Sequence, residues 1–87
     1  MPVRVEFFGV ARLHAGLPSI AVEASQLGEA IRRVEAEFPH LEGKLFQDGT
    51  LLSAFLANIN GKRFVSDPAT PLACGDSLLI LSADAGG

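Results

Sequence analysis

A single long amphipathic helical pattern lies in the middle of the chain, between short segments in which apolar and polar residues alternate. Its apolar positions have the spacing of one helix face: Leu27, Ala30, Ile31, Val34 and Phe38. Ser25 is predicted to cap the helix start, and Pro39 to end the helix at Phe38, because proline disfavours helical geometry in the residue before it. One helix covers only one face of a sheet, so this pattern strongly restricts the fold.

Short segments on both sides of this helix predict strands. Residues 3–8 and 19–24 alternate apolar and polar side chains and are expected to pair as an antiparallel hairpin. Asn60-Gly61 is a strong type I′ hairpin signal between residues 55–59 and 62–65. The last run, 77–82, is apolar enough to be a central strand.

Two less regular segments connect these elements. Val10, Ala11 and Leu13 predict a turn of helix after the first strand. Three apolar residues are expected to anchor a further short helical segment, closed by the turn Asp48-Gly49: Leu41, Leu45 and Phe46.

The predicted order is strand, strand, helix, strand, strand, strand. This order suggests an α+β fold of the β-grasp (ubiquitin-like) type, a mixed sheet of about five strands clasping one main helix. The first and last strands are then parallel neighbours at the sheet centre. We expect a β-grasp domain over residues 1–82 and a flexible tail over 83–87 that ends in Gly86-Gly87.

Composition excludes several classes of function. The chain has 87 residues, enough for one small domain, and its net charge of −3 with no basic cluster disfavours nucleic acid as a partner. Its longest apolar runs are too short to span a bilayer, and the start does not resemble a signal peptide. One cysteine forms no internal disulfide, which fits a reducing cytoplasm.

The residues that usually carry chemistry are sparse. Cys74 is predicted to be a packing residue because no histidine or lysine adjoins it to lower its thiol pKa. His14 and His40 are isolated, with no second ligand at a spacing typical of metal sites. We therefore expect no bound metal and no bound cofactor.

Strand alternation also predicts an exposed apolar patch. Phe8, Leu79 and Leu81 are expected on the sheet face opposite the helix, where Phe64 joins them. Such a patch usually marks an interface. In the alternative, residues 10–18 and the segment containing Leu41, Leu45 and Phe46 fold over this face and cover it.

The two terminal glycines have two readings. Without a Cβ atom, Gly86 and Gly87 suit a tail that threads a narrow cleft and offers its carboxylate to an enzyme. The other reading is an ordinary frayed end.

Three motifs in order resemble one family. Residues 7–12, Phe-Phe-Gly-Val-Ala-Arg, resemble the FFG-x-AR opening of MoaD/ThiS-type ubiquitin-like sulfur carriers, and residues 58–61, Asn-Ile-Asn-Gly, resemble their mid-chain hairpin. Pro71-Leu72, Gly75-Asp76, a short apolar strand and the final Gly-Gly resemble their closing segment.

The resemblance implies a chemical role for Gly87. A ubiquitin-activating-type adenylyltransferase would use ATP to adenylate its carboxylate, which then becomes a thiocarboxylate that donates sulfur. The chain would be a co-substrate without catalytic residues, most simply the small subunit of molybdopterin synthase beside its large subunit, in molybdenum cofactor biosynthesis.

Three alternatives stay open. The sulfur acceptor would belong instead to thiamine, cysteine or other sulfur metabolism or to tRNA thiolation. The chain would otherwise be a ubiquitin-like protein modifier that joins Gly87 to a lysine amine. In the last alternative it is a β-grasp interaction module with an incidental terminus.

Overall fold

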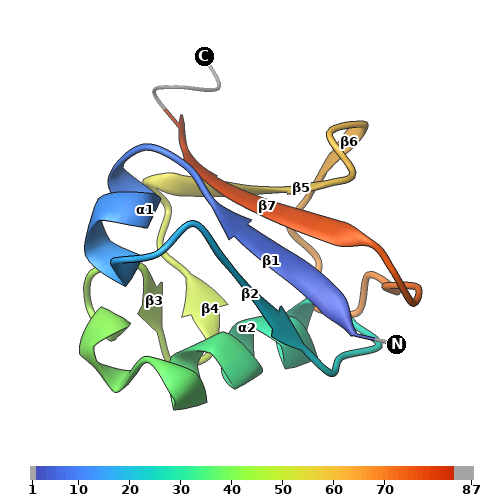
Figure 1. The fold of residues 1–87 in the computed structure, drawn as a ribbon, viewed down its shortest axis with the longest axis horizontal. Helices are drawn as coiled ribbons and strands as arrows, with labels where there is room; N and C mark the ends of the chain where they lie inside the picture. The colour runs from blue at the N-terminus through green and yellow to red at the C-terminus, as the bar shows by residue number, and fades with distance from the viewer. Residues whose placement is uncertain (1, 84–87) are drawn as a thin grey trace.

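The structure, a computed structural model, describes residues 2–83. Its main sheet has five strands in the order β2-β1-β7-β5-β6 (Figure 1). The strands are β1 Val3–Phe7, β2 Ser19–Val22, β5 Phe55–Ile59, β6 Arg63–Val65 and β7 Ser77–Ser82. β1 and β7 are parallel, whereas the other pairs of this sheet are antiparallel. The predicted β-grasp fold, with its last strand at the sheet centre, is confirmed.

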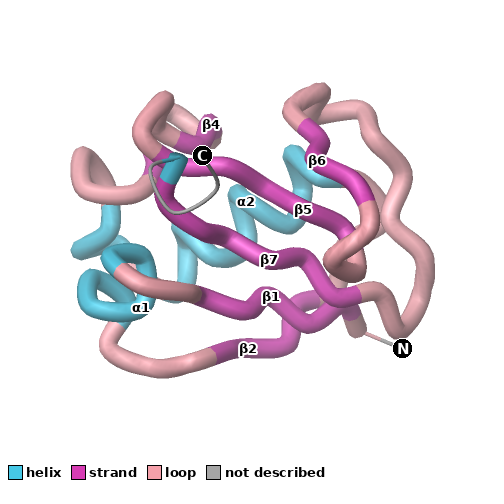
Figure 2. Tube along the Cα trace, turned by 90° about the horizontal axis from the view of Figure 1, so that it is seen from above, coloured by secondary structure: helices cyan, strands magenta, loops and turns pink. Residues whose placement is uncertain are grey.

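Helix α2, Leu27–Glu37, lies against one face of this sheet, and Figure 2 shows the strands in front of it. The shorter helix α1, Val10–Ala15, lies near the end of the sheet where β7 finishes. The fully buried side chains between α2 and the sheet include Phe7, Leu27, Val34, Leu78 and Ile80. Across residues 2–83, no helix has the length and apolar character needed to cross a membrane.

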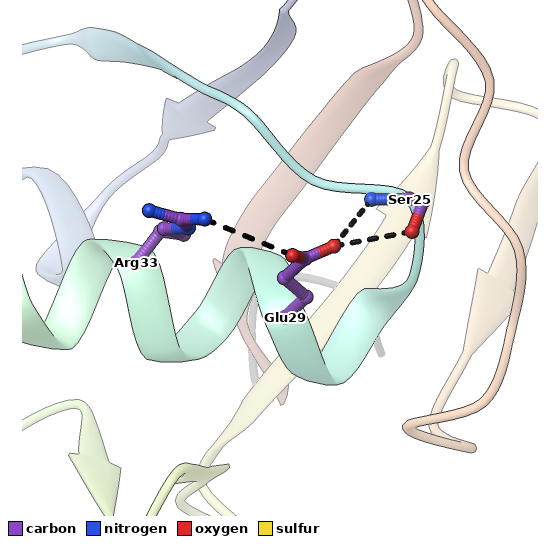
Figure 3. Close-up of polar contacts among 3 residues, drawn as sticks. All are labelled: Ser25, Glu29 and Arg33. Atoms are coloured by element: carbon purple, nitrogen blue, oxygen red, sulfur yellow. Dashed lines mark hydrogen bonds and ion pairs between the residues drawn. The ribbon is translucent and has the colours of Figure 1, made fainter.

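The start of α2 differs from the prediction. The N-cap is Gln26 rather than Ser25, and no side chain caps the helix there. The Glu29 carboxylate instead reaches back, accepting hydrogen bonds from the Ser25 backbone N–H at 2.7 Å and the Ser25 hydroxyl at 3.2 Å (Figure 3). Glu29 is at the third helical position, but its bonds go to Ser25, one residue before the N-cap Gln26, so the contact is not a capping box. An ion pair to Arg33 at 3.8 Å adds to the same cluster.

The connection between β6 and β7 supplies the rest of this cap. The Thr70 carbonyl accepts from the Leu27 N–H, and the Pro68 carbonyl accepts from the Gly28 N–H, each at 2.9 Å. These bonds pair donors that a helix start leaves unsatisfied. A Cβ atom at Gly28 would lie 3.0 Å from the Pro68 Cβ, so any side chain there would have to displace the Pro68 loop slightly.

The segment after α2 corrects a second prediction. A short 3-10 helix, η1 Pro39–Leu41, is followed by a hairpin of β3, Phe46–Gln47, and β4, Thr50–Leu51. The turn Asp48-Gly49 was placed correctly, with φ of 52° and 75°, but its flanks are strands rather than helix. Three residues of this region belong to the core, so they do not cover the other face of the sheet: Leu41, Leu45 and Phe46.

Candidate functional site

The sheet face turned away from α2 carries a group of apolar side chains. We call this group the outer face and define it by five residues: Phe8, Leu56, Phe64, Leu79 and Leu81. Strand register brings them together. Asn58 is paired with Phe64 on one side and with Leu79 on the other, and Leu56 is paired with Leu81. The four residues predicted for a partner interface therefore lie on one face.

The side chains of the outer face differ in exposure. Phe64 is 57% exposed and Phe8 is 37% exposed. Leu56, Leu79 and Leu81 are half-buried. Isolated exposed apolar residues are common on proteins, but a contiguous group is typical of a docking surface.

Phe8 is held in place by its neighbours. Its backbone N–H donates to the Ile80 carbonyl at 2.9 Å, which continues the β1–β7 pairing by one residue. The Arg12 guanidinium lies 5.8 Å from the centre of the Phe8 ring, and Arg12 Nε donates to the Phe7 carbonyl at 3.0 Å. A cation over an aromatic face is weakly attractive at exposed sites. Arg12 thus adds a positive charge to the rim of the outer face.

The root of the tail adjoins this face. The Ala83 N–H donates to the Ala54 carbonyl at 2.8 Å, which extends the β5–β7 pairing beyond Ser82. Leu81 lies two residues before this bond. The predicted tail residues Gly86 and Gly87 lie outside the described residues. A protein bound to the outer face would therefore lie next to Ala83, the last residue that the structure describes.

A polar residue lies in the middle of the outer face. Asn58 alternates with the inward residues Ala57 and Ile59, yet its side chain is only 7% exposed. Its Oδ1 atom is closed to solvent and has no hydrogen-bond partner among the described residues. Sequence reasoning used Asn58 only as part of a motif and assigned it no separate role.

Comparison with known proteins gives the same architecture. No protein-family model and no curated protein sequence matches the chain. Among solved structures, it is similar to SAMP1 from Haloferax volcanii, with 23% identity, a TM-score of 0.82 and complete coverage of both chains. That likeness establishes the fold.

Two other structures are complexes. The Amycolatopsis orientalis BexX/CysO complex matches at 26% identity and a TM-score of 0.77, covering 98% of this chain and 99% of that one. The complex of subunits 1 and 2 of the molybdopterin-converting factor from Helicobacter pylori matches at 24% identity and a TM-score of 0.65, covering 94% of this chain and 93% of that one. These likenesses confirm the predicted resemblance to the MoaD/ThiS-type ubiquitin-like sulfur carriers.

Two exposed apolar residues were not predicted from the sequence. Val10 is 45% exposed and Leu13 is 81% exposed, both on α1. The pattern Val10, Ala11, Leu13 predicted a helical turn but not which residues face solvent. The buried α1 residues are Ala11 and Ala15, so the larger apolar side chains are the ones left outside.

The cysteine and the two histidines do not form a catalytic or metal site among the described residues. Cys74 is exposed, so its predicted packing role is wrong. The His40 Nε2 atom lies 3.3 Å from the His14 carbonyl oxygen, a contact between a ring and the backbone. Within residues 2–83, no three metal-ligating side chains come together. The outer face with the adjoining tail root is therefore the candidate site.

Proposed function

We propose that this protein is a sulfur carrier whose Gly87 carboxylate is adenylated and then converted to a thiocarboxylate. The observation that carries the proposal is the whole-length likeness to CysO in its complex with BexX. The outer face, which adjoins Ala83, supports the proposal because it is a docking surface for proteins that act on the tail.

The chemistry follows from the properties of a carboxylate. A C-terminal carboxyl group has a pKa of about 3.5, so at neutral pH it is an anion and a poor electrophile. Attack of its oxygen on the α-phosphorus of ATP releases pyrophosphate and gives an acyl adenylate. A sulfide equivalent then attacks the carbonyl carbon and AMP leaves, which gives the thiocarboxylate.

The protein contributes no catalytic group to these steps. ATP and the base belong to a ubiquitin-activating-type adenylyltransferase, and no cofactor is bound by the chain itself. Gly86 and Gly87 allow the tail to enter a narrow active site because neither carries a Cβ atom. The single cysteine, Cys74, is compatible with work in the cytoplasm.

The proposed sulfur acceptor is a molybdopterin precursor held by the large subunit of molybdopterin synthase. The likeness to a complex of the two subunits of the molybdopterin-converting factor supports this choice. The same thiocarboxylate would serve carriers for other sulfur metabolites, so the acceptor needs its own test.

Intact-protein mass spectrometry tests the carrier role. The chain is incubated with ATP, Mg²⁺, its adenylyltransferase and a sulfur source. A mass gain equal to replacement of one oxygen by sulfur, mapped to Gly87, is expected. An unchanged mass with each candidate adenylyltransferase would contradict the proposal.

A second candidate is a protein modifier. The likeness to the small archaeal modifier protein 1 of Haloferax volcanii favours it. The acyl group of the same adenylate would pass to a lysine amine, forming an amide: AMP leaves in direct transfer, or AMP and then the enzyme thiol leave when a thioester lies between. Conjugates of higher mass, linked through Gly87, distinguish this function from sulfur transfer.

A further inference from the structure

The environment of Asn58 is unfavourable for the free protein. An amide oxygen that is buried without a hydrogen bond is strongly disfavoured, because it has lost water and gained no donor. Asn58 Oδ1 is in that condition among the described residues. Its row neighbours Phe64 and Leu79 are apolar, and asparagine is itself disfavoured in strands.

Register explains the burial. Asn58 is directly opposite Phe64 on β6 and directly opposite Leu79 on β7. Side chains opposite each other in antiparallel pairs have Cβ atoms about 4.5–5.5 Å apart, so the two larger side chains enclose the smaller one between them. Asn58 therefore lies between two side chains of the outer face.

One of these covering side chains is free to move. Phe64 is 57% exposed, and β6 is an edge strand of three residues. Exposed side chains change rotamer in nanoseconds or less. The Phe64 ring, directly opposite Asn58, can therefore turn without any change in the sheet.

We propose that Asn58 is a polar anchor for the adenylyltransferase, uncovered when Phe64 turns aside and then satisfied by an N–H or O–H donor of the enzyme. The inference rests on the proposed function. The partner chemistry follows from the surroundings: an apolar surface that fits Leu79 and Leu81, with one donor and no carboxylate facing Asn58. An acceptor at that point would leave both oxygens unpaired.

The adenylyltransferase is the partner chosen because it must recognise the chain before any sulfur is present. The tail offers it little to recognise, since residues 83–87 are Ala, Asp, Ala, Gly and Gly. Recognition must therefore come from the folded domain. A single buried acceptor within an apolar surface gives specificity, because a partner without the donor leaves it unsatisfied.

The test compares Asn58→Val with Ser19→Val. Ser19 lies on the same face at the far end of the same row, opposite Glu6, so it undergoes a similar polar-to-apolar change away from Phe64. For each chain we would measure the melting temperature alone and the Kd for the adenylyltransferase by titration calorimetry. In parallel, adenylation of Gly87 would be followed by mass spectrometry.

Opposite effects on stability and binding are expected for Asn58→Val. The melting temperature rises by about 4–8 °C, the shift expected in a domain of this size when a strand-favouring apolar residue replaces an unsatisfied one. The Kd weakens by about tenfold, the effect of one lost hydrogen bond. Ser19→Val changes the Kd by less than about twofold.

Two results overturn the inference. One is a lower melting temperature in Asn58→Val, which makes Asn58 a structural residue of the free protein. The other is a Kd within about twofold of wild type while Gly87 of the wild-type chain is adenylated normally. If the wild-type chain neither binds the enzyme nor is adenylated, the proposed function fails as well, so the two failures are distinguishable.

Discussion

Asn60 and Asp76 join two turns that are 16 residues apart, through a hydrogen bond of 3.0 Å from Asn60 Nδ2 to Asp76 Oδ1. The other carboxylate oxygen accepts from the Ala73 N–H at 2.8 Å, and Asn60 Oδ1 accepts from the Ser77 N–H at 2.8 Å. The hairpin turn of β5–β6 is therefore tied to the turn that begins β7. This contact sets the start of the central strand.

Asp76→Asn is expected to lower stability at neutral pH. The Ala73 N–H, and then the Asn60 amide, hold the pKa of Asp76 below its ordinary value of 3.8. Because the folded-state pKa is the lower one, the stabilisation is present above 3.8 and is lost as the pH falls through the folded value. Because Asp76 lies near the surface, Asp76→Asn is expected to lower the free energy of unfolding at neutral pH by about 1 kcal/mol.

Urea unfolding at neutral and acid pH checks this expectation. The difference in free energy of unfolding between wild type and Asp76→Asn should shrink as the pH falls below 3.8. Glu23→Gln, which removes an exposed carboxylate elsewhere, serves as the control for net charge. A difference that stays constant with pH would mean that the carboxylate charge is not involved.

Deletion of Gly87, or Gly86→Leu, is expected to abolish thiocarboxylate formation and to leave folding intact. Both residues follow the last described sheet bond, from the Ala83 N–H to the Ala54 carbonyl, so the strand pairings of residues 2–83 are expected to remain. The melting temperature should therefore stay within about 2–4 °C of wild type. Full sulfur transfer by the truncated chain, measured with the acceptor enzyme, would refute the carrier role.

Phe7 and Phe8 form a matched pair for testing the outer face. Phe8→Glu is expected to weaken the Kd for the adenylyltransferase at least about tenfold and to change the free energy of unfolding by less than about 1 kcal/mol. Phe7→Glu is expected to unfold the chain, because Phe7 is fully buried and a charge there has no partner. Circular dichroism with titration calorimetry separates the two effects. Global unfolding by Phe8→Glu would place Phe8 in the core.

Gly28→Ala is expected to destabilise the protein by about 1–3 kcal/mol. In an open helix this change is stabilising by about 1 kcal/mol. Here the added Cβ lies 3.0 Å from the Pro68 Cβ, in the loop that pairs the helix start. Chemical denaturation of the single variants and of Gly28→Ala with Pro68→Gly measures the coupling. Additive losses in that cycle would exclude the steric explanation.

Sequence patterns predicted the long elements well and the short ones poorly. The five-position stripe from Leu27 identified α2, and Asn60-Gly61 identified the β5–β6 hairpin, because each pattern is longer or more specific than its competitors. β3 and β4 have two residues each, too few to show any period. Ser25 was a reasonable N-cap by residue type, but the bonds from Thr70 and Pro68 decide where the helix begins.

The same limit applies to the candidate site. Alternation alone placed Phe8, Leu79 and Leu81 on one face. The burial of Asn58 required the register of three strands, which no local pattern carries. The exposure of Leu13 required knowledge of how α1 packs against the sheet.

The place of β7 has a consequence for the timing of synthesis. The strand that pairs with both β1 and β5 is the last to be made, so the sheet has a gap at its centre until residues 77–82 have emerged from the ribosome. Pairing between segments so distant in sequence is also slow. A nascent chain without β7 therefore lacks two of the five residues of the outer face, Leu79 and Leu81. An enzyme that binds this surface would act only on chains in which residues 77–82 have already been added.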